Sequence, residues 1–161
     1  RDDLTGMITY GGARFPVWWK KTSPRVVEPL DNDIECETMN GNIILIPRKV
    51  YLAMGNLEAG FIHGMGDFDY GFRVRKAGFQ IFAAKGHHGF CSPNNNKRTF
   101  RDISLSFSER WPLVCGPKGR PPGPWAVYTR RHCGPFWFLY WAWPYLYTLC
   151  SSVIISRRKE S

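Results

Sequence analysis

The sequence predicts an α/β fold, and three short stretches carry this prediction. Residues 43–46 read Ile-Ile-Leu-Ile, a continuous apolar run between turn residues that is typical of a strand buried on both faces. Residues 67–77 are typical of a helix, which Gly78 would end at its C′ position. Residues 79–84 follow as a second buried strand. Helix and strand therefore alternate in the middle of the chain.

The other segments are predicted to be loops or short helices. Residues 1–38 are rich in loops, because several prolines break any regular period. A helix is expected over residues 48–54, which Pro47 opens and Gly55 closes. The later segments are a turn-rich loop, a helix and a rigid proline-rich linker: residues 86–96, 100–110 and 117–124.

Composition narrows the class of protein. The chain of 161 residues is 43% hydrophobic and 16% aromatic, enough to fill the core of one globular domain. Its net charge is +9, but the basic clusters fall mostly in loops and at the end of the chain. A nucleic-acid binder concentrates such charge on one face, so the scatter favours anionic lipids or phosphorylated substrates instead. The five cysteines include no Cys-x-x-Cys pair, which fits reduced thiols in a cytosolic protein.

Two carboxylates one residue apart open the predicted helix over residues 67–77. Free N–H groups and the helix dipole stabilise an ionised carboxylate at Asp67, which suits either a general base or an ordinary helix cap. Asp69 lies four residues before Arg73, so the two side chains can pair on one helix face. The spacing alone leaves these alternatives open.

The surrounding motifs resemble the acceptor-side half of family 2 inverting glycosyltransferases, which have the GT-A nucleotide-sugar transferase fold. That family runs from Asn-Gly through an apolar strand, Pro-Arg, a short helix and an acidic motif to a helix ending in Lys-Ala-Gly. The resemblance covers roughly residues 5–90, with a further similar tail over residues 117–145. The matching motifs lie at residues 39–51, 54–58, 61–63 and 66–70.

The resemblance implies a mixed sheet with flanking helices, a nucleotide-sugar donor, and a glycan or lipid-linked acceptor. Asp67 takes the position of the general base. A divalent metal, Mg²⁺ or Mn²⁺, would be held mostly by an Asp-x-Asp motif upstream of this sequence, with His88 as a candidate additional ligand. The positions that match acceptor-binding residues are Asn40, Gly41, Asn42, His63, Met65 and Asp69.

Each of these positions also has a plainer interpretation. Residues 40–42 can form a simple turn before a strand, and His63 and His88 can be loop histidines without a ligand role. The family begins with a donor-binding half that does not precede Arg1, so we expect the chain to be the C-terminal portion of a longer transferase, inactive alone. The expected location is cytoplasmic, with peripheral attachment at the inner face of the cell membrane as an option.

The expected division is an acceptor-side domain over residues 1–116, followed by a linker and a helical extension over residues 117–161. Residues 135–155 approach the roughly 20 residues that span a bilayer. Pro144 and the many Trp and Tyr residues favour a helix lying on the membrane surface over a span. The basic end would contact anionic headgroups through Arg157, Arg158 and Lys159.

Three functions therefore compete at this point. The first is a glycosyltransferase fragment that transfers a sugar with inversion, with Asp67 as its base. The second is a non-catalytic glycan-binding module. The third is a membrane-surface interaction module that uses the aromatic, basic tail.

Overall fold

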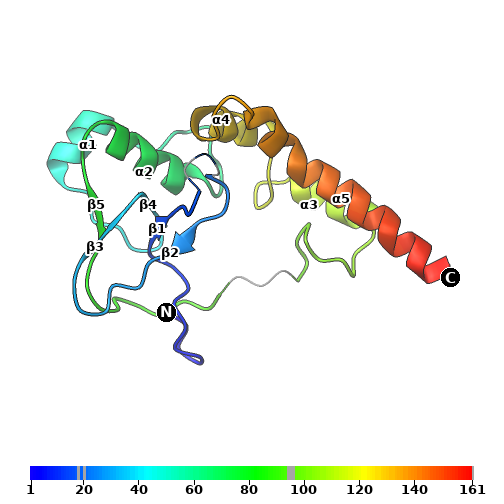
Figure 1. Ribbon diagram of the computed structural model, residues 1–161, viewed down its shortest axis with the longest axis horizontal. Helices are drawn as coiled ribbons and strands as arrows, with labels where there is room; N and C mark the ends of the chain where they lie inside the picture. Colours follow the sequence, from blue (N-terminus) through cyan, green and yellow to red (C-terminus); the bar gives the residue numbers. More distant parts are fainter. Residues whose placement is uncertain (18, 20, 94–96, 161) are drawn as a thin grey trace. The chain divides into compact units, whose positions relative to one another are not determined.

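The computed structural model describes residues 1–17, 19, 21–93 and 97–160, with side chains up to residue 152 in the last helix. The described chain contains five α-helices and two small antiparallel sheets (Figure 1). It forms two compact units. The first consists of Arg1–Phe61 and Met65–Pro93, and the second of Ile62–Gly64 and the described residues from 97 onward. The α/β class is thus confirmed, and the GT-A architecture stays a prediction.

The strands of the first unit form two separate sheets. One has the order β2-β1-β4, built from Arg25–Val26, Gly12–Arg14 and Thr38–Met39. The other pairs β3, Ile34–Cys36, with β5, Ile81–Ala83. Every pairing among the described strands is antiparallel. The expected mixed sheet is therefore wrong for this part of the chain.

The predicted strand over residues 43–46 is also wrong. These residues form no strand, and Ile43 and Leu45 are 70% and 93% exposed. A strand exists only where a neighbour supplies backbone partners, whatever the preference of its side chains. The second predicted strand, 79–84, is shorter than expected and only half-buried. Phe82 at the middle of β5 is 54% exposed.

The helices of the first unit begin and end within one residue of the predicted positions. Helix α1 spans Arg48–Met54 between Pro47 and Gly55. Helix α2 spans Gly66–Lys76, and Gly78 just beyond it has a φ of 88°, the left-handed conformation that glycine adopts without strain. Helix α2 packs on β4, where the Thr38 hydroxyl donates to the Phe68 carbonyl at 3.0 Å. This contact fixes the start of α2 on the sheet.

The second unit contains α3, Phe107–Cys115, α4, Pro122–His132, and α5, Trp137–Glu160. The prediction of a helix over residues 100–110 is wrong. A capping box between Ser106 and Glu109 starts α3 at Phe107 instead. The proline-rich segment is only partly a linker, because Pro122 opens α4 at a position where proline is tolerated.

The tail is helical as expected, but Pro144 does not interrupt it, and α5 runs through this residue. The two compact units divide after Pro93 rather than at residue 116, because α3 packs against α5. Within the described residues, no helix combines the length and apolar character needed to cross a bilayer.

Candidate active site

The carboxylate of Asp67 joins two segments of the first unit. Its Oδ2 accepts a hydrogen bond from the Gly41 backbone N–H at 2.8 Å, and its Oδ1 accepts one from the Phe68 N–H at 2.9 Å. Asp67 is half-buried in the first turn of α2. It therefore satisfies a free N–H at the helix start, as a cap would, and also holds the loop at residues 40–42.

The backbone around Asp67 is tightly constrained. Met65, the N-cap residue of α2, has a φ of 65°, an uncommon conformation for a residue other than glycine. A Cβ on Gly66 would lie 3.2 Å from the Cβ of Phe61, and one on Gly41 would lie 3.4 Å from Oδ2 of Asp67. Small residues at both positions let the backbone approach closely. The Asp67 carboxylate is thus held by the Gly41 backbone on one side and by the start of α2 on the other.

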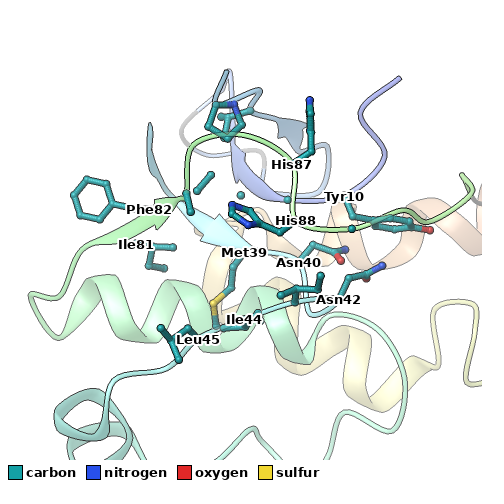
Figure 2. Close-up of a pocket in the computed structure, with 18 of the residues that line it drawn as sticks. Tyr10, Met39, Asn40, Asn42, Ile44, Leu45, Ile81, Phe82, His87 and His88 are labelled. Carbon is teal, nitrogen blue, oxygen red and sulfur yellow. The ribbon is translucent and has the colours of Figure 1, made fainter. Parts of the chain in front are cut away.

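The loop that Asp67 holds lines a pocket of about 720 Å³ within the first unit. Asn40 and Asn42, on either side of Gly41, both face this pocket (Figure 2). The Oδ1 atom of Asn40 is buried and has no hydrogen-bond partner among the described residues. A buried acceptor without a partner is costly, and a ligand hydroxyl would satisfy it.

The pocket has a polar end and an apolar end. Figure 2 shows Tyr10 near Asn40 and Asn42 on one side, and Leu45, Ile81 and Phe82 on the other. The apolar run that was predicted as a strand thus contributes to the wall of the pocket. Such a combination of apolar lining with a few polar groups is typical of small-ligand sites.

Neither Asp67 nor Asp69 is among the residues that line this pocket, and Asp69, unlike the half-buried Asp67, is fully buried. Its Oδ2 accepts a hydrogen bond from Nε of Arg73 at 2.8 Å, which is the ion pair that the four-residue spacing predicted. Arg73 also donates from Nη2 to the Asn56 carbonyl at 3.4 Å. This geometry gives Asp69 a structural role, so the acceptor site proposed below does not include it.

The remaining predicted site residues occupy different places. Met65 is half-buried in the first unit, directly before α2. His63 is exposed and belongs to the short segment that groups with the second unit. His88 lines the pocket, with its Nε2 3.0 Å from the Lys85 carbonyl oxygen.

The described residues do not by themselves form a divalent-metal site. No group of three or more His, Cys, Asp or Glu side chains gathers anywhere among them. His88 supplies at most one ligand, and its Nε2 is already in hydrogen-bonding distance of a carbonyl.

Sequence reasoning missed several residues of the pocket wall. Tyr10, His87 and Cys91 all line it, and the Asn42 amide lies 3.5 Å from the Cys91 sulfur. The turn-rich segments that contain them were visible in the sequence. Their convergence was not, because Asn42 and Cys91 are 49 residues apart.

Comparison of the chain with protein-family models, with curated proteins and with solved structures found no match.

Proposed function

We propose that this chain supplies the acceptor side of an inverting glycosyltransferase, with Asp67 as the general base. The observation that carries the proposal is the bond between Asp67 and Gly41, which fixes a carboxylate to the loop that lines the pocket. The motif resemblance supports the same role for Asp67. The pocket's polar end would receive a hydroxyl-bearing acceptor.

The proposed step transfers one proton, forms one bond to the anomeric carbon and breaks another. Asp67 removes the proton from an acceptor hydroxyl while that oxygen attacks the anomeric carbon of a nucleotide-sugar. The bond from this carbon to the diphosphate breaks on the opposite face, so the configuration inverts. Two backbone N–H groups hold the Asp67 carboxylate in place, and each of its oxygens keeps a lone pair for the acceptor proton.

Acceptor recognition is assigned to residues 40–42. The unpartnered Oδ1 of Asn40 can accept from a sugar hydroxyl, and the Asn42 amide can both donate and accept. Gly41, between them, leaves room for the close approach of the Asp67 carboxylate. The acceptor class we propose is a glycan or a lipid-linked glycan, at the cytoplasmic face of a membrane.

The test is substitution of Asp67 in a transferase that contains this chain together with a donor-binding half. Loss of a general base should lower turnover in the Asp67→Asn variant by about a hundredfold or more, with little change in donor affinity. Asp31→Asn, in an exposed turn, is the matched control and should keep full turnover. Near-normal turnover of a folded Asp67→Asn protein, or a product with retained anomeric configuration, would overturn the proposal.

The same pocket also fits glycan binding without transfer, and one comparison separates the two functions. Under the proposal, Asp67→Asn removes turnover but leaves acceptor binding nearly intact, whereas Asn40→Ala weakens acceptor binding. Titration of acceptor glycans, followed by amide NMR shifts in residues 40–42, measures this binding. If the chain binds acceptor glycans but transfers no sugar with any donor-binding half joined to it, the non-catalytic module is favoured.

A further inference from the structure

Helix α5 has two faces of different composition. Positions three or four residues apart share a helix face. One such series, the inner face, is Trp141, Tyr145, Thr148 and Ser152, and another, the outer stripe, is Leu139, Trp143, Leu146 and Leu149. The two faces have very different surroundings within the second unit.

Helix α5 packs against α3 and α4 (Figure 1), and its inner face makes hydrogen bonds to this part of the second unit. Nε1 of Trp141 donates to the Pro122 carbonyl at 3.0 Å, and the Tyr145 hydroxyl donates to the Arg120 carbonyl at 2.6 Å. Ser152 accepts from Nη1 of the buried Arg110 at 3.1 Å. These contacts fix the rotation of α5 about its axis, and so determine which residues face outward.

The outer stripe is exposed along its length. Leu139, Trp143 and Leu146 are 59%, 66% and 52% exposed, and Leu149 is 47% exposed. Phe136, just before the helix, and Phe138, in its first turn, are also exposed. Apolar side chains of this size rarely stay in water as a contiguous patch unless a partner covers them.

The charge around the stripe identifies the kind of partner. Residues 117–159 contain seven Lys or Arg and no Asp or Glu, and Glu160 follows them. Arg130 and Arg131 are exposed in the last turn of α4, shortly before α5 begins. Arg157, Arg158 and Lys159 follow the stripe in the sequence, although their side chains lie outside the described part. A second copy would bring like charges together, whereas an anionic surface complements them.

We propose that the outer stripe of α5 docks on an anionic phospholipid membrane, with the helix lying in the plane of the surface. Trp and Phe prefer the interface between headgroups and acyl chains, and neighbouring basic residues are attracted to anionic lipids. This inference does not rest on the proposed glycosyl transfer.

Vesicle co-sedimentation of the 161-residue chain tests the proposal. The chain should pellet with vesicles of equal parts phosphatidylcholine and phosphatidylglycerol, bind pure phosphatidylcholine much less, and be released partly by added salt. The variant Leu139→Ser/Trp143→Ser/Leu146→Ser should bind the anionic vesicles about tenfold or more weakly. Its circular dichroism should match that of the wild type, because the three side chains are exposed.

The matched control is Trp19→Ser/Leu52→Ser/Leu57→Ser, which removes the same residue types from exposed positions of the first unit. It should bind vesicles as the wild type does. The proposal would be overturned if both variants lost vesicle binding equally, or if the wild-type chain did not pellet with anionic vesicles. Sedimentation equilibrium showing a wild-type dimer in lipid-free solution that the stripe variant abolishes would also overturn it, because the stripe would then be a protein interface.

Discussion

Some charged side chains of this protein are buried or half-buried, and each of them makes several hydrogen bonds. Arg110 is fully buried, and its Nε donates to the Phe100 carbonyl at 2.8 Å while Nη1 donates to Ser152. Glu37 accepts from the Phe15 backbone N–H at 2.8 Å and pairs with Lys21. The Glu37 carboxyl makes the ion pair with Lys21 only in its charged form, so its effect on stability depends on pH.

Glu37 gives a pH-dependent prediction. Burial raises the pKa of its carboxyl, but hydrogen bonds from Lys21 and Phe15 and the charges of Lys21 and Arg75 together outweigh burial and lower the pKa below its usual 4.5. A lowered folded-state pKa contributes stability above the unfolded value, which is lost as pH falls through the folded value. The melting temperature of the wild type should exceed that of Glu37→Gln near neutral pH, and this difference should shrink below pH 4.5.

Thermal melts of both proteins across this pH range measure the effect. Glu28→Gln changes an exposed glutamate of the same unit and serves as the control, with a melting temperature close to that of the wild type throughout. A wild-type advantage over Glu37→Gln that persists unchanged in acid would show that the carboxyl charge is not what stabilises this region.

Helices were predicted better than strands, because their signals are local. Gly55 and Gly78 end α1 and α2 as expected from the sequence. Residues 43–46 had the composition of a strand, but composition cannot supply the neighbouring backbone that a strand requires. The signal for the start of α3, the capping box between Ser106 and Glu109, is also local, but the prediction did not use it.

The candidate site was predicted as a set of residues but not as a geometry. The resemblance singled out both Asp67 and Gly41, yet they are 26 residues apart, and nothing in their spacing showed that they bond. The ion pair of Asp69 with Arg73 followed directly from helix periodicity. Other residues of the pocket wall were missed, because segments far apart in the sequence build it: Thr9 donates to the Cys91 carbonyl across 82 positions.

The contact between helix α2 and strand β4 predicts the effect of a substitution at Gly71. A Cβ on Gly71 would lie 2.3 Å from Oγ1 and 3.0 Å from Cα of Thr38, and Thr38 is held in the sheet by its pairing with Ala13. Gly71→Ala should therefore destabilise the protein by about 1–3 kcal/mol, although alanine is the better helix former.

Urea denaturation measures this cost. The control is Gly123→Ala in α4, where an added Cβ meets nothing within 4 Å, so this variant should be neutral or slightly stabilised. If Gly71→Ala proves as stable as Gly123→Ala, the helix does not pack on β4 as closely as described here.

The whole chain consists of two units with separate sets of buried residues. The first buries Phe15, Tyr70 and Val74, and the second buries Val114 and Tyr128. Compact units with their own cores commonly open as independent cooperative units. The functional proposals divide in the same way, because the candidate active site belongs to the first unit and the outer stripe to the second.

Two matched valine substitutions test this independence. Val74 lies on α2 and Val114 on α3, and both are buried, so each change to alanine should cost about 1–3 kcal/mol through lost contacts and a small cavity. Hydrogen exchange should show Val74→Ala lowering protection in α2 but not in α3–α5, and Val114→Ala lowering protection in α3–α5 but not in α2. Loss of protection across both units in either variant would mean that the chain unfolds as one cooperative body. The active-site and membrane variants would then each have to be checked for stability of the entire chain before their effects were assigned to one surface.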